Sequence, residues 1–210
     1  MSNMNKVIVH PVYFGSIAQW SVMIKYGHII FENEDNYQKQ TYRNRMHIYG
    51  ANGKLTLSIP IRHSKTDGRQ RYADVRIEND FDWQKQHWKS LETAYRTSPF
   101  FEYYEAYFEP LYQTAYVNLM AFNYDCMQAI TQCLQLEFTP HKTEAYQDSY
   151  VNAKDYRHLV VAKKEKEYSL ESYGQVFIEK YGFICNLSVF DLLCNMGPQS
   201  ITYLQEQYPF

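Results

Sequence analysis

The chain has 210 residues, with 21 Lys or Arg and 23 Asp or Glu side chains, so its formal net charge is −2. This near balance argues against a protein whose main task is to bind nucleic acid, because such domains usually carry a large basic excess. The mean hydropathy is −0.54, no apolar run approaches the roughly 20 residues of a spanning helix, and the polar N-terminus lacks a signal-peptide core, so we expect no membrane span and a cytoplasmic location.

The first part of the chain predicts a strand–helix–strand unit followed by a hairpin. Lys6–Val9 and His28–Phe31 are short apolar runs typical of buried strands. Residues 15–26 between them carry apolar side chains at helical spacing, which favours a parallel strand pair with a right-handed crossover. Arg45–Tyr49 and Lys54–Ile61 flank an Asn-Gly turn and predict a β-hairpin.

Helices dominate the remainder. Tyr72–Ile77 predicts one more strand, and residues 140–167 have few aliphatic side chains and a charged run, which predicts a partly flexible excursion. The fold class is therefore α/β: a mixed β-sheet from the N-terminal half covered by helices from the C-terminal half, in a single domain over residues 1–210. The predicted helices span Trp83–Tyr95, Pro99–Tyr107, Leu111–Leu136 and Leu187–Leu193.

Neither the cysteines nor any catalytic motif identifies a cofactor. The spacing of Cys126, Cys133, Cys185 and Cys194 fits no familiar zinc site, so buried reduced thiols and no metal are expected. Nucleophile elbows, phosphate loops and dinucleotide fingerprints are also missing from the sequence. Tyrosine accounts for 21 residues, which suits either wet binding clefts or half-buried packing positions.

His10 follows the first predicted strand, where ligands bind in open α/β sheets, and histidine is well suited to proton transfer near neutral pH. The alternative is a histidine that bonds a loop carbonyl and shapes the turn. Tyr13 can present its hydroxyl to the same cleft or pack in the core. Lys39, Asn44 and Arg45, with Arg43 between them, form a cationic cluster suited to phosphate or carboxylate, or a solvated polar loop.

Two further groups of polar residues lie in the helical part. Lys85 and His87 fall near the start of a predicted helix, where anions are favoured. Asp191 interrupts an apolar helix and must be paired, by Arg45 or by a neighbouring turn, or line the floor of a site. The candidate catalytic residues are His10 and His87, and the candidate substrate-binding residues are Tyr13, Lys39, Asn44, Arg45, Lys85 and Asp191.

The chain carries four stretches in this order: His10–Tyr13, Tyr37–Arg45, Trp83–His87 with Ser98–Phe101, and Asn186–Pro198. Together they resemble the WbqC-like protein family. The sequence departs from the family pattern where Pro11 follows His10 directly and where Met46 and His47 replace a second Asn-Arg pair. The resemblance implies a context of bacterial surface polysaccharide, O-antigen in particular. It implies no catalytic residues that can be transferred.

These observations lead to one main hypothesis and two alternatives. The main hypothesis is an enzyme that transfers an acyl or aminoacyl group to a phosphorylated or nucleotide-linked sugar, with His10 as acid or base. The first alternative is a non-catalytic binding or assembly protein of the same pathway that uses its Tyr-rich surface. The second is an analogy to nucleotidyltransferases, whose second histidine and phosphate loop are missing here. The expected partner is a sugar or nucleotide-sugar, the cofactor is unknown, and an oligomer is left open.

Overall fold

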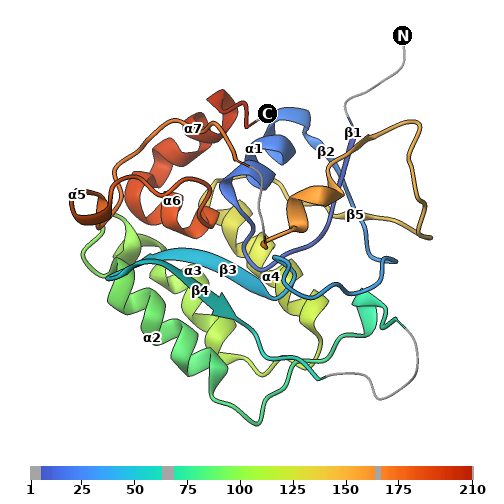
Figure 1. Cartoon of the computed structure of the whole chain (residues 1–210), viewed down its shortest axis with the longest axis horizontal. Coiled ribbons are helices and arrows are strands. Elements are labelled where there is room, and N and C mark those ends of the chain that lie inside the picture. Colours follow the sequence, from blue (N-terminus) through green and yellow to red (C-terminus); the bar gives the residue numbers. More distant parts are fainter. Residues whose placement is uncertain (1–5, 63–68, 164–166, 210) are drawn as a thin grey trace.

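A computed structural model describes residues 6–62, 69–163 and 167–209 (Figure 1). Within these ranges, one sheet has the strand order β5-β2-β1-β6, and all its pairings are parallel. Val9 of β1 lies opposite Phe31 of β2, so the two strands end level with each other. The predicted parallel pair is confirmed. The strands are β1 (Lys6–Val9), β2 (His28–Phe31), β5 (His141–Lys142) and β6 (Lys154–Asp155).

Local sequence signals account for the crossover between β1 and β2. Helix α1 (Ile17–Tyr26) begins after Ser16, whose side chain accepts a hydrogen bond from the backbone N–H of Gln19. It ends at Gly27, which has φ +70°, a left-handed conformation that costs glycine little. The N-terminal part of α1 is buried, which fits a helix enclosed between the sheet and the C-terminal helices.

The hairpin forms a second, two-stranded sheet rather than joining the first. Strands β3 (Arg45–Gly50) and β4 (Gly53–Ser58) pair antiparallel around the expected turn, so the hairpin and the α/β class are confirmed. Strand β3 contacts helix α2, and Figure 1 shows the hairpin lying across the α2 side of the molecule. The helices are α2 (Trp83–Tyr95), α3 (Phe101–Gln113), α4 (Leu119–Cys133), α5 (Ile178–Tyr181), α6 (Val189–Met196) and α7 (Ser200–Glu206).

Two predicted elements differ from the structure. The long helix expected over Leu111–Leu136 is divided, because its first turn belongs to α3 and α4 begins only after Asn118, whose side chain caps Ala121. The strand expected over Tyr72–Ile77 is a short 3₁₀ turn over Tyr72–Asp74 followed by isolated bridges. The backbone groups of residues 72–77 form hydrogen bonds to loops rather than to a neighbouring strand. The alternating apolar side chains are therefore buried although the segment is not part of a sheet.

Residues 141–161, which we call the strap, hold both edges of the parallel sheet. The strap contains β5, β6 and a 3₁₀ turn over Arg157–Val160. β5 pairs with β2 on one side and β6 pairs with β1 on the other. The predicted excursion therefore contributes two strands to the sheet, while its flexibility stays a prediction. In the described part of the chain, no helix is both long and apolar enough to cross a membrane.

Candidate functional site

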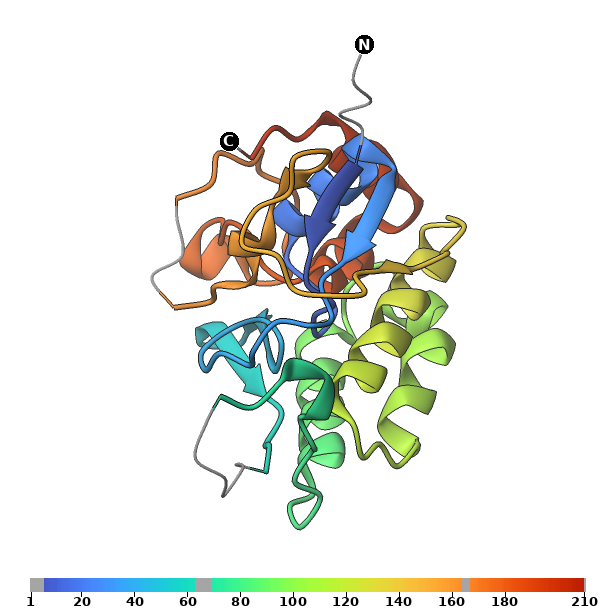
Figure 2. The same ribbon diagram turned by 90° about the vertical axis from the view of Figure 1, so that its right-hand side faces the viewer.

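Polar side chains gather where the parallel strands end. His10 follows β1 directly and Glu32 follows β2, and the level ends of these strands place the two residues side by side. Asp155 ends β6 on the other side of β1. Figure 2 shows the arrowheads of β1 and β2 pointing to the middle of the molecule. This carboxyl edge is where open α/β sheets bind ligands.

A cavity of about 430 Å³ lies at this edge. Its wall combines residues that follow β1 and β2 with residues of the strap, so segments far apart in sequence form it together. Its volume lies within the range of small-molecule sites. The lining residues are His10, Asp35, Gln38, Arg43, Tyr146, Asp155, Arg157, His158, Val160 and Val161.

His10, Asp35 and Arg43 form a triangle of close polar contacts in the cavity wall. The His10 Nε2 atom lies 2.9 Å from Asp35 Oδ2 and 2.7 Å from Arg43 Nη2, which itself donates to Asp35 Oδ2 at 2.7 Å. A proton on Nε2 makes the bond to Asp35, whereas a proton on Nδ1 lets Nε2 accept from Arg43. His10 comes from the loop after β1, whereas Asp35 and Arg43 both come from the segment between β2 and β3. The contacts hold the three side chains against one another.

Burial sets the charge state of the triangle. Burial lowers the pKa of His10 to about 4, although the bond to Asp35 opposes this shift. The imidazole is therefore neutral at pH 7 and able to accept a proton. Burial alone raises the pKa of Asp35, but the His10 bond and the Arg43 charge outweigh it, so its pKa falls below the ordinary value. The site thus holds a neutral base beside a carboxylate and a guanidinium.

The triangle leaves polar atoms without partners. Arg43 is 0% exposed, and its Nε and Nη1 atoms have no hydrogen-bond partner among the described residues. His10 Nδ1 is likewise buried and unpartnered. Burying a guanidinium with unmade hydrogen bonds is costly, and burial lowers the pKa of Arg43 accordingly. These atoms fit a site that a polar ligand completes.

Glu32 holds the strap against the end of β2. It is fully buried, and Oε1 accepts from Thr143 Oγ1 at 2.9 Å while Oε2 accepts from the Tyr150 hydroxyl at 2.9 Å. Arg157 Nη1 lies 3.4 Å from Oε2, and the same guanidinium bonds both oxygens of Asp155. One carboxylate therefore fixes three residues of the strap, and with them the strap side of the cavity.

Replacing Glu32 with Gln is expected to loosen the strap. The amide removes the charge and one acceptor oxygen, so the bonds from Thr143, Tyr150 and Arg157 cannot all be kept. We expect a loss of about 2–3 kcal/mol in the free energy of unfolding, measured by urea denaturation. Trypsin should also cleave at Lys154 faster than in the unaltered protein.

The control for this prediction is Glu34→Gln. Glu34 pairs with Arg71 at the surface, where an ion pair contributes about 1 kcal/mol or less. Equal stability and equal cleavage rates in the Glu32 and Glu34 variants would contradict the role of Glu32 in holding the strap.

The structure places Tyr13 and His87 together, but not at the cavity. The Tyr13 hydroxyl lies 3.0 Å from His87 Nδ1 and 2.6 Å from the Tyr112 hydroxyl, and all three residues are buried. His87 also bonds the Ser58 backbone, and burial lowers its pKa to about 4. Tyr13 and His87 therefore belong to a buried hydrogen-bond network with Tyr112. The catalytic and binding roles predicted for them stay predictions.

The predicted cationic cluster is divided by the fold. Lys39 is exposed and lines a second hollow beside the cavity. Asn44 is buried and donates from Nδ2 to the Ile59 carbonyl at 2.9 Å, and Arg45 begins β3 outside both linings. Lys85 lies exposed on α2 and lines neither hollow. Among the predicted residues, the fold brings only His10 and Lys39 to this region.

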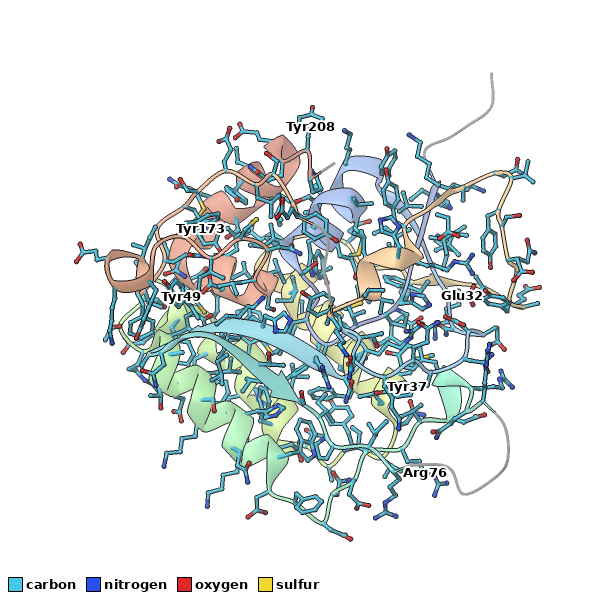
Figure 3. The ribbon with its side chains drawn as sticks, viewed as in Figure 1. Glu32, Tyr37, Tyr49, Arg76, Tyr173 and Tyr208 are labelled. Atoms are coloured by element: carbon cyan, nitrogen blue, oxygen red, sulfur yellow. The ribbon has the colours of Figure 1, made fainter. Side chains whose placement is uncertain are left out.

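Asp191 is buried in helix α6, and both of its carboxylate oxygens accept hydrogen bonds. Its oxygens accept from the Tyr95 hydroxyl at 2.7 Å and the Tyr173 hydroxyl at 2.5 Å, with no contact to Arg45. Burial raises the pKa of Asp191 to about 6, although these hydrogen bonds oppose the shift. Figure 3 shows Tyr173 on the opposite side of the molecule from Glu32 and Tyr37. The carboxylate is thus paired, as its apolar surroundings require, and its binding role stays a prediction.

Three of the four cysteines are buried as expected, whereas Cys185 is partly exposed. Cys126, Cys133 and Cys194 are buried, and burial raises the pKa of the Cys133 thiol to about 12. Within residues 6–62, 69–163 and 167–209, no three His, Cys, Asp or Glu side chains gather in a way that holds a metal ion.

Sequence reasoning missed most of the residues that surround His10 at the sheet edge. Glu32 carried a usable signal, because it follows β2 as His10 follows β1. Arg43 lies inside the predicted cluster, yet nothing in that run marks it as the inward-facing cation. Asp35, Asp155 and Arg157 reach the site only through loops and the strap, so no local pattern points to them.

Two of three comparisons with known proteins found a match. The model of the WbqC-like protein family matches residues 10–169, a range that includes every residue of the cavity wall. An uncharacterized protein of Mycobacterium tuberculosis, Rv1507c, is 26% identical over an alignment of 207 residues that covers 84% of this chain and 87% of that protein. No solved structure matches the chain at a significant level.

Proposed function

Because this chain belongs to the WbqC-like protein family, we propose that it is a transferase of bacterial surface-polysaccharide biosynthesis, with the cavity at the sheet edge as its active site. The observation that carries the proposal is the triangle of His10, Asp35 and Arg43 in the cavity wall, with unpartnered atoms on two of its members. A neutral base held by a carboxylate, next to a buried cation, is suited to acyl transfer to a hydroxyl or amine, because it supplies both a proton acceptor and a donor for the oxyanion.

His10 acts as the general base. With its proton on Nε2, the ring donates to Asp35 Oδ2 and keeps a lone pair on Nδ1, the atom that has no partner among the described residues. The Asp35 carboxylate fixes this tautomer and stabilises the imidazolium that forms when Nδ1 takes a proton. The low pKa of about 4 keeps the ring neutral before the reaction.

The step balances with an activated acyl donor, such as a thioester. The acceptor hydroxyl or amine gives its proton to His10 Nδ1 as its oxygen or nitrogen attacks the acyl carbon. The new C–O or C–N bond forms, the C–S bond breaks, and the leaving thiolate takes the proton back from the imidazolium. Arg43 Nε and Nη1 supply hydrogen bonds to the oxyanion of the tetrahedral intermediate.

The acceptor is a sugar, free or linked to a phosphate or nucleotide. The two carboxylates and two guanidinium groups of the cavity wall are already paired with one another, through Asp35 with Arg43 and Asp155 with Arg157. Paired charges of this kind offer hydrogen-bond sites to hydroxyl groups without favouring a net ligand charge. Gln38 and the Tyr146 ring complete a wall suited to a polar ring with one flat face.

The test is an acyl-transfer assay with the purified protein, acetyl-coenzyme A and glucosamine 1-phosphate, following release of free thiol. His10→Gln is expected to lower kcat by a factor of about 100 or more with little change in KM. His141→Gln, an exposed histidine on β5, is the matched control and should keep the full rate. The acid limb of the rate profile should lie near pH 4 rather than near pH 6.5.

Two results would contradict the proposal. One is a His10→Gln variant that transfers at the rate of the unaltered protein. The other is a protein that binds the sugar phosphate but transfers no acyl group from a panel of thioester, acyl-phosphate and aminoacyl-ester donors, which would favour the non-catalytic binding protein.

A further inference from the structure

A second hollow of about 540 Å³ adjoins the cavity. The two share Asp35, Gln38 and Tyr146, so these three side chains form a common wall between them. Figure 3 shows Tyr37, which lines the second hollow, on the same side of the molecule as Glu32 at the sheet edge. The remaining lining residues are Asn36, Lys39, Arg69 and Asp148.

The two hollows differ in the charges that stay available to a ligand. In the cavity, each carboxylate is bonded to a guanidinium. The second hollow is lined by two cations, Lys39 and Arg69, and by two carboxylates. One carboxylate, Asp35, is already bonded to Arg43 and His10. Only Asp148 is left to balance the two cations. The second hollow therefore carries an excess of positive charge, although the chain as a whole has a net charge of −2.

Neighbouring charges add to this excess. Burial raises the pKa of Tyr37, and the positive charges of Arg43 and Arg45 act against that shift. Arg45 thus contributes to the potential of the second hollow without lining it. A concave surface with an excess of positive charge attracts anions, and its cationic side chains hold them through charge-assisted hydrogen bonds.

We infer that the second hollow binds the phosphoryl group of a phosphorylated sugar through Lys39 and Arg69, while the sugar ring reaches past Gln38 to His10. This inference rests on the proposed function and deepens it by naming the anionic part of the substrate. Lys39 and Arg69 provide charged donors from two separate segments, which suits a phosphate with three terminal oxygens. Tyr37 and Tyr146 flank the same space and give a sugar or base a flat surface.

Calorimetric titration of the full chain at low salt tests the inference with glucose, glucose 1-phosphate, glucuronate and uridine diphosphate as probes. Glucose 1-phosphate should bind at least tenfold more tightly than glucose, and this difference should shrink as salt is added. Lys39→Gln and Arg69→Gln should each weaken glucose 1-phosphate binding about tenfold, with little effect on glucose. Lys54→Gln and Arg76→Gln, exposed residues outside the hollow, are the matched controls.

The probes separate the sources of the anion. Tight binding of uridine diphosphate as well as glucose 1-phosphate supports the inference with a nucleotide-linked sugar as ligand, whereas tight binding of glucose 1-phosphate alone supports it with a simple sugar phosphate. Stronger binding of glucuronate than of either would overturn it in favour of a carboxylate site. Equal affinity for glucose and glucose 1-phosphate, or an unchanged affinity in the Lys39/Arg69 double variant, would also overturn it.

Failure of this inference is distinguishable from failure of the proposed function. His10→Gln should keep its affinity for glucose 1-phosphate, because His10 lies in the cavity and not in the second hollow. If phosphate binding depends on Lys39 and Arg69 but no transfer occurs, the binding assignment stands and the transferase proposal falls. If transfer depends on His10 but the two cations are dispensable, the opposite holds.

Discussion

Replacing Arg43 with Met is expected to lower the free energy of unfolding by about 3 kcal/mol, because it leaves a partly buried carboxylate without its charged partner. Arg43 is 0% exposed and donates to Asp35 at 2.7 Å. The methionine fills much of the space but supplies no donor. Urea denaturation at pH 7 measures the change. The control is Arg62→Met in the exposed pair with Glu78, where a loss of less than about 1 kcal/mol is expected.

A double-mutant cycle separates the ion pair from simple packing. Asp35→Asn removes the charge that Arg43 compensates, so the Arg43→Met change should cost less in the Asp35→Asn background than alone. The pKa of His10 should rise in Arg43→Met, because the Arg43 charge is one of the causes that lower it. Purely additive losses, with an unmoved His10 titration, would show that the triangle does not act as a unit.

Acidification from pH 6.5 to pH 4 is expected to remove stability on the order of 5 kcal/mol. Burial lowers the pKa of His10, His47 and His87 to about 4. In the unfolded chain these groups bind protons near their ordinary pKa of 6.5, while the folded protein leaves them neutral until about pH 4. Proton binding therefore stabilises the unfolded state relative to the folded state as the pH falls through this window, and the loss of stability is complete below pH 4.

Asp191 acts in the opposite direction over part of the same window. Its pKa of about 6 lies above the ordinary value of 3.8, so the folded protein takes up this proton first and gains stability as the pH falls from 6 to 4. One such gain offsets one of the three histidine losses, each about 3 kcal/mol. The slope of unfolding free energy against pH reports the net proton uptake. His47→Gln should reduce that uptake by about one proton, and a flat profile from pH 6.5 to 4.5 would refute the assignment.

Local signals were enough to predict the elements whose cause is local. The capping Ser16, the left-handed Gly27 and the Asn-Gly turn each mark a boundary by their own conformational preference, and α1 and the hairpin follow from them. The prediction of one long helix over Leu111–Leu136 was wrong because the local signal was not recognised. Asn118 caps α4, but it lies within a run of apolar residues at helical spacing. The strand predicted from Tyr72 onward was wrong because burial alone does not distinguish a strand from a buried turn.

Of the candidate site, only the position of His10 was predictable from the sequence. The position of His10 after a strand indicated a place at the sheet edge, and the structure puts it in a cavity wall there. Its partners depend on how loops fold back, which spacing along the chain does not encode. Asn44 and Arg45 neighbour Arg43 in sequence, but the bend into β3 turns Arg43 alone to the cavity. His87 and Asp191 look reactive in sequence because they are polar, and the structure pairs each of them inside the core.

The strap also determines when the protein can fold during its synthesis. Val7 in β1 pairs with Lys154 in β6, so the parallel sheet lacks one edge until the ribosome has released nearly three-quarters of the chain. Until then, β1 and β2 carry open edges that a neighbouring nascent chain can extend. Such late, non-local pairing also slows folding. Translation that stalls before residue 154 would leave a fragment that needs chaperone protection, and expression at lower temperature should raise the yield of native protein.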